Sequence, residues 1–392
     1  RTNLSFNYMK ADGYYENKAY DRYTVRMNND WKVNNWLSAA VDVNFSQSED
    51  ITPANDDVYF RTYEASPYYT AYWEDGRMAD CKDGYNPLSY LNGGTNNTKY
   101  YRLQAKAQLN INPFKGFTLT VVFAPNYMFT KAKRFLKKVD LNYEDGRTVA
   151  CEWFNINSLN ESRNDNHSYT TQLYANYTTD FGSKNHSFTA MAGYEGYTYE
   201  WENEGASRTN YILTNYPYLN LGPEDYQYNY GSAGHNAYQS IFGRLMYSFK
   251  NRYLIQANVR ADASSRFAPD YRWGVFPSMS LGWVVSEEPW FNNKSFVNYF
   301  KFRGSIGSLG NERIGSEFPY QALTVFGNSY VYDKSTQSVT AVQNAHQTYY
   351  AFEDITWETT TSYGLGLDAN LIDSRLNLNL DVYYKKTENM LL

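Results

Sequence analysis

Histidines, cysteines and clustered carboxylates are the residues of this sequence that could do chemistry, and their spacing favours no enzymatic reaction. His167, His186 and His235 fall in segments that we expect to be loops, and none stands at the ligand spacing of a zinc site. The runs GSLGN (307–311) and GLGLD (364–368) are not followed by a helical pattern or a Lys-Ser/Thr pair, as a phosphate-binding loop requires. We therefore expect no catalytic residues, no metal and no cofactor.

The acidic run NDD (55–57) is a candidate for calcium, because Ca²⁺ prefers carboxylate oxygens as ligands. The run lacks the ligand spacing of known calcium loops. We expect solvated loop charge, and the sequence alone leaves calcium in the loops open.

Aromatic side chains dominate three runs between the expected strands: PYYTAYWEDG (67–76), NYPYLNLGPEDYQYNY (215–230) and GNSYVYD (327–333). Exposed tyrosine and tryptophan rings offer flat faces to sugar rings or peptide side chains, and their polar tips can form hydrogen bonds. We predict a binding surface for a nutrient oligomer that includes Tyr69, Tyr72, Trp73, Tyr226 and Tyr228. An alternative is that these rings only pack the loops against one another.

Cys81 and Cys151 are the only cysteines, and each ends a similar segment: EDGRMADC (74–81) and EDGRTVAC (144–151). Each Asp-Gly pair predicts a turn, and each cysteine follows its arginine by four positions. A disulfide between two such loops would indicate an oxidising compartment. Two unrelated thiols are the alternative, and the sequence alone leaves the pairing open.

Composition narrows the class of protein that could carry these loops. The chain has 392 residues, a formal net charge of −5 and a pI near 5.5, which argues against a nucleic-acid partner. Mean hydropathy is −0.68, and no apolar run approaches the roughly 18 residues of a membrane helix. The 41 Tyr, 22 Phe and 9 Trp residues suit a membrane–water boundary or a tyrosine-rich soluble β-protein. A β-barrel stays possible, because its strands alternate and escape hydropathy averages.

An alternation of apolar and polar residues predicts the elements that position the loops. In RLNLNLDVYYKKTENMLL (375–392) apolar side chains stand at every second position near the start, and LSAAVDVNFS (37–46) has the same pattern. Successive side chains of a strand point to opposite faces, so each segment has one apolar and one polar face. We expect about thirteen strands of about ten residues or more, which is long for a soluble sheet.

The predicted connections alternate between two kinds. Tight turns are expected at NPFKG, GSKNH, KNR and DS, and long polar loops near 50–99, 133–166, 203–236 and 311–355. This asymmetry is typical of a transmembrane antiparallel β-barrel with its apolar face toward lipid and its polar face toward a lumen. On the lumen face, Arg260 and Asp262 share parity and could pair. A soluble β-protein that packs its apolar face against a second sheet is the alternative.

Several collinear segments resemble the SusC/RagA family of TonB-dependent outer-membrane transporters of Bacteroidota. Residues 240–291 resemble the family's order of S-x-F-G-R-x-x-Y, R-Y-L, R-x-D-x-S-S-R-F, G-x-F-P-S and G-W with a paired Glu. Residues 301–315 resemble K-x-R-x-S-x-G-x-x-G-N, and residues 355–391 resemble W-E, G-x-D and D-x-Y-x-K-x-T-x-x-M-L. DRYTVRMNNDW (21–31) is similar to an early barrel strand of the family. The R-x-D segment has Ala263 where the family commonly has Gly.

The resemblance implies a structural role for eight residues in these motifs: Arg260, Asp262, Arg266, Phe267, Trp283, Asn311, Trp357 and Glu358. It also implies that residues 1–392 are the central part of a barrel of about 22 strands, without the plug domain that precedes the barrel in the family. We expect an internal piece of a longer polypeptide, because an open sheet would leave unsatisfied backbone groups in lipid.

The function implied by the resemblance is uptake of an oligosaccharide or a peptide across the outer membrane of a Gram-negative bacterium. A SusD-like surface lipoprotein would act as a lid, and the TonB complex would supply energy through the plug region. The transporter–lipoprotein pairs could form dimers. The barrel would contact outer-membrane lipid and perform no covalent chemistry.

Two other functions fit parts of the same pattern. A passive outer-membrane porin or an adhesin barrel would have the same strands and no plug. A secreted, tyrosine-rich carbohydrate-binding or surface-layer protein would be soluble without detergent. An enzyme has no supporting set of residues.

Overall fold

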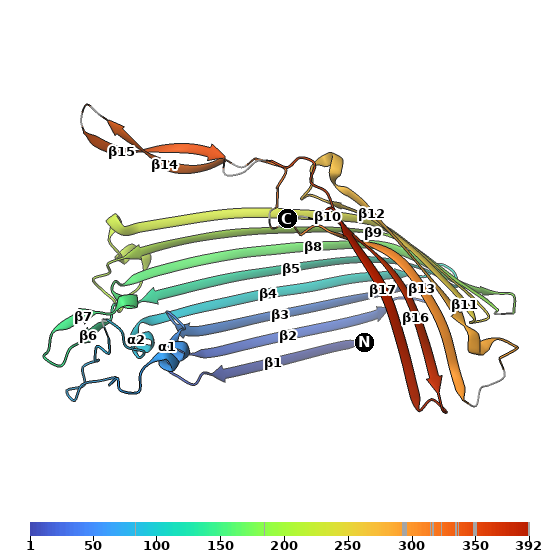
Figure 1. Ribbon diagram of the computed structural model, residues 1–392, viewed down its shortest axis with the longest axis horizontal. Coiled ribbons are helices and arrows are strands. Elements are labelled where there is room, and N and C mark those ends of the chain that lie inside the picture. Colours follow the sequence, from blue (N-terminus) through green and yellow to red (C-terminus); the bar gives the residue numbers. More distant parts are fainter. Residues whose placement is uncertain are drawn as a thin grey trace.

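The computed structural model describes residues 1–82, 84–183, 185–291, 296–313, 315, 317–322, 324–333, 335, 337–347 and 351–390. Most of them form one sheet of 13 antiparallel strands, which confirms the expected all-β fold class (Figure 1). In sheet order the strands are β1 (Thr2–Asp12), β2 (Ala19–Lys32), β3 (Leu37–Pro53), β4 (Gly94–Ile111), β5 (Phe117–Leu136), β8 (Ser158–Phe181), β9 (His186–Thr209), β10 (Gln227–Phe249), β11 (Tyr253–Ser264), β12 (Trp273–Val284), β13 (Val297–Asn311), β16 (Glu358–Leu371) and β17 (Leu376–Glu388).

The other described elements lie in the connections. Two small sheets pair β6 (Asp140–Asn142) with β7 (Thr148–Ala150), and β14 (Thr324–Asp333) with β15 (Ser338–Gln347). The helical elements are α1 (Val58–Glu64), α2 (Ser89–Asn92) and the 3₁₀ turns η1 (Glu152–Phe154), η2 (Leu219–Leu221), η3 (Glu224–Tyr226), η4 (Pro269–Tyr271) and η5 (Val285–Glu287). Within the described ranges, no helix has the length and apolar character needed to span a membrane.

Alternation along the strands gives the large sheet one apolar and one polar face. Large apolar side chains of the first face are exposed in every large-sheet strand from β2 to β16, and examples in strand order are Val25, Phe45, Leu103, Phe123, Leu173, Tyr194, Ile241, Ile255, Leu281, Ile306 and Leu365. The strand register places each of these residues on the same side as its cross-strand neighbours. A continuous exposed apolar face of this extent indicates contact with a membrane or a partner.

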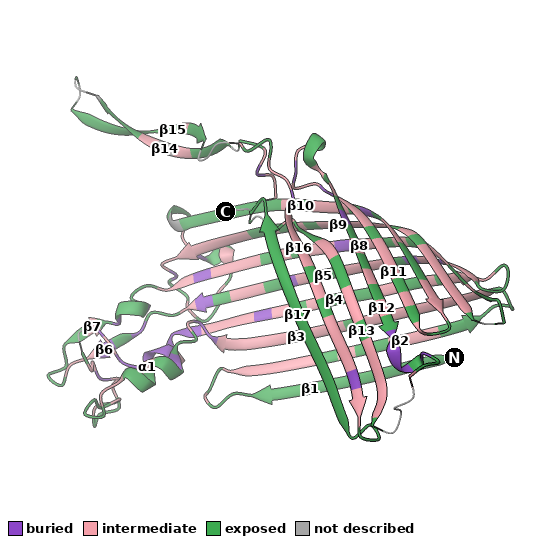
Figure 2. Cartoon of the chain, turned by 45° about the vertical axis from the view of Figure 1, so that its right-hand side comes forward, coloured by how far each residue is buried: buried purple, intermediate pink, exposed green. Residues whose placement is uncertain are grey.

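The polar face is the concave face. A hollow of about 650 Å³ is lined by Ser187 of β9, Gln256 of β11, Arg303 of β13 and Asp381 of β17. Strands β9 and β17 are separated by five strands of the sheet, so only strong curvature brings them to one hollow. Figures 1 and 2 show this curvature, with β16 and β17 crossing at a steep angle to β1–β5.

Three of the four long connections are shorter than expected, because their flanking strands run further than the alternation indicated, whereas the fourth agrees with the expected 311–355 within two residues. The long connections occupy 54–93, 137–157, 210–226 and 312–357, and the last of these contains β14 and β15. Segments 158–166 and 203–209 are strand although they carry few apolar residues, since neither face of the sheet needs to be apolar there. His167, His186 and His235 accordingly lie on β8, β9 and β10 and not in loops.

The height of the sheet changes abruptly after β10. Strands β8, β9 and β10 have 24, 24 and 23 residues, whereas β11 and β12 have 12 each. Strand β10 therefore pairs with β9 along its whole length but with β11 only from Tyr238 onward. The result is a step in the wall at the end that carries the long connections.

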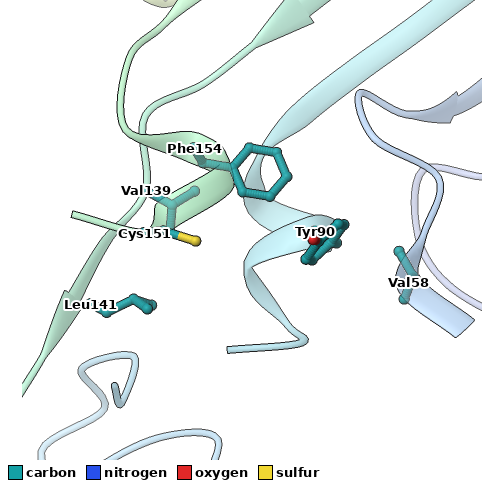
Figure 3. Close-up of a cluster of buried hydrophobic side chains, with 6 residues drawn as sticks. All are labelled: Val58, Tyr90, Val139, Leu141, Cys151 and Phe154. Carbon is teal, nitrogen blue, oxygen red and sulfur yellow. The ribbon is translucent and has the colours of Figure 1, made fainter. Parts of the chain in front are cut away.

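Buried apolar side chains gather in two of the long connections. Figure 3 shows one cluster, formed by Val58, Tyr90, Val139, Leu141, Cys151 and Phe154. The rings of Tyr90 and Phe154 meet edge to face, with their centroids 5.1 Å apart. Residues 54–93 and 137–157 thus form one folded unit above the sheet, which we call the loop cap.

Candidate functional site

A row of hydrogen-bonded polar side chains crosses four strands of the concave wall. Arg260 on β11 donates from Nε to Asp262 Oδ1 at 2.7 Å and from Nη2 to Glu195 Oε1 at 3.0 Å. The same Nη2 donates to Ser240 Oγ at 2.7 Å, and Gln172 Nε2 donates to Glu195 Oε2 at 2.6 Å. The shared parity of Arg260 and Asp262 predicts the pairing that the structure contains. Two carboxylates around one guanidinium give this row a net negative charge at neutral pH.

A second row lies on the same face near the β17 edge. Arg303 on β13 donates from Nε to Asp368 Oδ1 at 3.1 Å, and its Nη1 lies 2.6 Å from Asp381 Oδ1. A Cβ on Gly366 would lie 2.5 Å from the Arg303 Cζ atom, so glycine leaves room for the guanidinium to lie across β16. Both rows offer fixed charges and hydrogen-bond partners to a polar solute on the concave side.

Residues from three of the motif segments meet in one aromatic cluster at the long-connection end of the sheet. Phe267, Phe276 and Trp357 are buried together, with ring centroids 5.3 Å apart for Phe267 and Trp357 and 5.4 Å for Phe276 and Trp357. Trp357 Nε1 donates to the Arg272 carbonyl at 2.8 Å, and Arg272 Nε donates to the Phe267 carbonyl at 3.0 Å. A Cβ on Gly310 would lie 2.1 Å from Phe276 Cζ, so the cluster also requires this glycine. These contacts fasten the top of β11 and β12 to the start of β16.

Asn311, Glu358 and Arg266 lie beside this cluster. Asn311 Nδ2 is 3.4 Å from Glu358 Oε1, which links the end of β13 to the start of β16. The backbone N–H of Arg266 donates to Ser264 Oγ at 3.2 Å, within the turn that follows β11. Both contacts lie at the long-connection end of the sheet.

Trp283 lies at the opposite end of the sheet, near the end of β12. Its Nε1 donates to Glu288 Oε1 at 3.0 Å, and the hydroxyl of Tyr253 donates to the same oxygen at 2.6 Å. Arg252 Nη1 lies 3.5 Å from Glu288 Oε2. The Tyr253 and Trp283 hydrogen bonds hold the pKa of the Glu288 carboxyl below its usual range. Glu288 is the hub of this anchor, and its place in the paired-Glu motif was the only sequence signal for it.

Of the three aromatic residues predicted to bind cargo in the first long connection, one makes a contact within the loop cap and two are exposed. Trp73 is half-buried and donates from Nε1 to the Asn142 carbonyl at 2.5 Å, so it holds the two segments of the loop cap together. Tyr72 is 47% exposed, and Tyr69 is exposed as well. Two tyrosines of α1 that the sequence analysis did not single out, Tyr59 and Tyr63, are more exposed, and their spacing of four on a helix was the missed signal.

The second predicted group lies on a different part of the surface. Tyr228 is on β10 and not in a loop as expected, because β10 begins at Gln227. Its ring is 65% exposed and its centroid lies 6.2 Å from that of Tyr230. Tyr226 ends η3, and its side chain lies outside the described part of the structure. Among the described residues, no hydrogen bond or ring contact joins Tyr228 to Tyr69, Tyr72 or Trp73.

The two cysteines are free thiols, so the disulfide that the sequence left open is not formed. Cys151 is buried with its Sγ 3.3 Å from Ser89 Oγ, and Cys81 Sγ lies 3.4 Å from the Thr70 carbonyl. Burial raises the pKa of the Cys81 thiol. The similar segments reflect two hairpin tips that lie side by side, since the backbone N–H of Asn142 donates to the Met78 carbonyl at 2.9 Å.

The acidic run 55–57 is engaged by neighbouring side chains. Asp56 accepts from Lys18 Nζ at 2.6 Å and from the hydroxyl of Tyr15. Asp57 lies 4.0 Å from Arg61 Nη2. No group of three or more histidine, cysteine or carboxylate side chains placed to hold a metal occurs in the described ranges.

Sequence relatives of the chain are TonB-dependent receptors. The family model described as "TonB dependent receptor-like, beta-barrel" matches residues 1–392. The TonB-dependent receptor P39 of Formosa agariphila is 26% identical over 393 residues, which cover 98% of this chain and 35% of that protein. The TonB-dependent receptor SusC of Bacteroides thetaiotaomicron is 38% identical over 166 residues, which cover 41% of this chain and 16% of that protein.

Solved structures share the fold. The RagAB peptide transporter gives a TM-score of 0.76 at 19% identity over 99% of this chain and 43% of that chain. The siderophore receptor PiuA from Acinetobacter baumannii gives 0.52 at 11% identity. The chain thus spans about a third of the length of P39 and less than half of the matched RagAB chain. It belongs to the TonB-dependent receptor-like β-barrel family, and it is similar to SusC and to the RagAB transporter.

Proposed function

We propose that this chain forms part of the wall of an outer-membrane importer for an oligomeric nutrient, in a Gram-negative bacterium. The observation that carries the proposal is the two-faced sheet, with a continuous exposed apolar face outside and charged, hydrogen-bonded rows on the concave side. A curved sheet of this kind can separate lipid from an aqueous path. The similarity to TonB-dependent receptors supports the same reading.

Completion of the barrel is part of the proposal. Strands β1 and β17 are the two edges of the described sheet. Each unsatisfied backbone group in hydrocarbon costs several kcal/mol, so both edges need partners in a membrane. The remaining strands of a barrel of about 22, and a plug inside it, would come from regions of the polypeptide beyond residues 1–392.

A SusD-like lipoprotein is the proposed partner at the long-connection end, acting as a lid. One solved relative is described as an importer in an "open-open" state and in a "closed-closed" state. By analogy, lid and barrel would enclose cargo between them, and two such pairs could associate. The TonB complex would act on the plug and release the cargo inward, with no covalent step.

The exposed aromatics of the loop cap and of β10 are the proposed contacts for cargo. Tyr69, Tyr72 and Tyr228 present rings to solvent. Trp73 joins the cap segment that carries the first two to segment 137–157. Rings of this kind stack on sugars and on peptide side chains alike. The motif residues around Arg260 and Trp357 are proposed as structural supports of the wall and rim.

Uptake by the native bacterium tests the proposal. Cells with the intact gene and cells without it are offered fluorescent oligosaccharide and oligopeptide pools, with and without a protonophore. We expect uptake of one pool to require both the gene and the proton gradient. Gene-dependent uptake that ignores the protonophore would indicate a passive porin, and no gene-dependent uptake of either pool would refute import.

A variant separates cargo binding from assembly. Replacing Tyr69, Tyr72 and Tyr228 together by alanine should raise the half-saturating cargo concentration roughly a hundredfold, if each ring contributes about 1 kcal/mol. Tyr14→Ala is the matched control, because Tyr14 is fully exposed in the β1–β2 connection and outside the proposed contacts. Equal uptake by the triple variant and the control would remove these rings from the cargo site.

A further inference from the structure

The upper part of β10 has a strand neighbour on one side only. Residues Gln227–Phe249 all pair with β9, but pairing with β11 begins at Tyr238 opposite Ser264. Ala237 is engaged by Ser265, whose backbone N–H donates to the Ala237 carbonyl at 2.9 Å. Residues 227–236 therefore present a free backbone edge, as far as the described chain shows, above the step formed by β11 and β12.

This edge lacks the features that normally protect an edge strand. Natural sheets block exposed edges with lysine, proline, bulges or inward charges. Residues 227–236 read QYNYGSAGHN, with no Lys, Arg, Asp, Glu or Pro. The register with β9 has no bulge in this stretch. An unprotected straight edge is suited to accept another strand.

The hairpin β14–β15 has no further strand beside it in the described structure. Its two strands pair only with each other, and an isolated two-stranded hairpin is marginally stable in water. Phe326 and Tyr330, which share one face, are 71% and 76% exposed. Figures 1 and 2 show the hairpin projecting past the β10 side of the large sheet without joining it.

The segment that leads to this hairpin is already seated at the lower end of the free edge. Trp201 Nε1 donates to Glu317 Oε1 at 2.8 Å, and Trp201 lies opposite Gly234 of β10. The next residue, Phe318, packs its ring 5.2 Å from the ring of His235. Gly234 and His235 are consecutive in a strand and face opposite sides of the sheet. Glu317 and Phe318 thus place successive side chains on opposite faces, as a strand beside β10 would.

We propose that residues 227–236 of β10 form a strand-acceptor site and that β14 is its occupant, with β15 as the next strand outward. The direction fits, because β10 runs away from the long-connection end, and a chain that leaves Phe318 toward that end is antiparallel to β10. Phe318 already lies beside His235, so the eight residues 227–234 stay open toward the long-connection end for the 10-residue β14. The chain between Phe318 and Thr324 must leave the edge for β14 to reach these residues, and its six residues, with a reach of about 20 Å, are long enough for such a detour.

The docked hairpin would fill the step in the wall. Strands β14 and β15 would stand above β11 and β12 and continue the height of β8–β10. The concave side would then be walled without a gap from β8 toward β13. This role concerns the shape of the vestibule and goes beyond the proposed import, since it does not depend on which cargo is carried.

Cysteine cross-linking in the full-length protein, in outer membranes, tests the docking. The background carries Cys81→Ser and Cys151→Ser, and Ser232→Cys on β10 is combined in turn with cysteine at 325, 326, 327, 329 and 330 of β14. Neighbouring strands lie about 5 Å apart, within the roughly 7 Å that a disulfide tolerates between Cα atoms, whereas β15 would lie about 10 Å away. We expect disulfides at alternate β14 positions and none at their β15 partners 346, 345, 344, 342 and 341.

The positive control is Ser232→Cys with Asn203→Cys, which are register partners on β10 and β9. Three outcomes would each overturn the proposal. They are disulfides that form from β15 but not from β14, disulfides that form between two copies of the protein, and the absence of any hairpin disulfide while the control pair cross-links. Hydrogen exchange gives a second readout that needs no cysteine. Replacing residues 324–347 by a Gly-Ser linker should speed amide exchange of 228–234 at least about tenfold if β14 protects them, and unchanged exchange would contradict docking.

Discussion

The loop cap and the hairpin β14–β15 lie at the same end of the molecule and are both rich in aromatic residues, yet they use them in opposite ways. The cap buries Tyr90 and Phe154 in a shared core. The hairpin exposes Phe326 and Tyr330 on one face. Aromatic content therefore does not decide whether a connection in this chain becomes a folded unit or a projecting surface.

The cap differs from the hairpin because it is built from two chain segments and contains buried side-chain hydrogen bonds. Asn86 is fully buried, and its Nδ2 donates to the Ala71 and Ala79 carbonyls at 2.9 and 2.8 Å. The second segment, 137–157, contributes Phe154 and the Asn142 carbonyl that Trp73 reaches. The contacts described for the hairpin are its own ladder and the Asn344–Ser329 side-chain bond of 2.6 Å. A second layer, supplied from 60 or more residues away, is what makes the cap stable.

The largest expected difference in stability between the two regions follows from removing one aromatic ring from each. Phe154→Ala should destabilise the cap by about 3–5 kcal/mol, because it empties a fully enclosed site. A Cβ on Gly93 would lie 2.1 Å from Phe154 Cε1, which shows how closely the ring is enclosed. Phe326→Ala, the matched change in the hairpin, should alter local stability by less than about 0.5 kcal/mol if the hairpin is free.

Hydrogen exchange over 54–93 and 324–347 in the full-length protein measures both changes. A large effect of Phe326→Ala would show that the hairpin has found a partner surface, and the acceptor edge of β10 would be the first place to look. Small effects of both variants would show that the cap core contributes little.

Loss of a buried hydrogen-bond donor should reduce cap stability less than loss of the Phe154 ring, but more than loss of an exposed contact. Asn86→Ala leaves two buried carbonyls without their donor, so we expect a loss of about 1–3 kcal/mol in cap stability. Asn344→Ala is the matched change in the hairpin, where water can replace the lost partner. Protease nicking within 54–93 reads the difference, and equal nicking rates in both variants would contradict the assigned role of Asn86.

Thiol reactivity gives a smaller and more local comparison. Cys151 is in the cap core, Cys81 is partly exposed with a raised pKa, and Ser329→Cys would place a thiol on the hairpin. We expect maleimide to react fastest at 329, more slowly at Cys81, and at least about tenfold more slowly still at Cys151. Adding Phe154→Ala should remove the protection of Cys151 from maleimide. Continued protection would show that the core around Phe154 is not what shields this thiol.

The sequence predicted the repeating parts of this molecule and missed the parts that depend on distant contacts. The alternation in 376–384 predicts β17, and the shared parity of Arg260 and Asp262 predicts their ion pair, because both follow from the two-residue period of a strand. The meeting of Tyr90 and Phe154 could not be predicted, since no local pattern reports which two loops touch. Strand continuation through 158–166 was missed for a different reason, because a strand with two polar faces has no apolar period.

The smallest expected effect concerns the tips of the cap, where Asp75 and Asp145 make the same contacts in two turns. Asp145 accepts from the Arg147 backbone N–H at 3.0 Å and from Arg147 Nε at 2.7 Å, and these bonds hold the pKa of the Asp145 carboxyl below its usual range. The stabilising contribution is therefore complete above the unfolded-state pKa of about 3.9 and is lost as pH falls through the lower folded-state value. Asp145→Asn should make amide exchange of 143–147 modestly faster at pH 7, and the difference from the parent should shrink as pH falls below about 3.9. The twin turn at Asp75 provides the internal control, since its exchange should not respond to the Asp145 change unless the two tips form one cooperative unit. A difference that does not shrink as pH falls below about 3.9 would show that the charge of Asp145 is not what holds the turn.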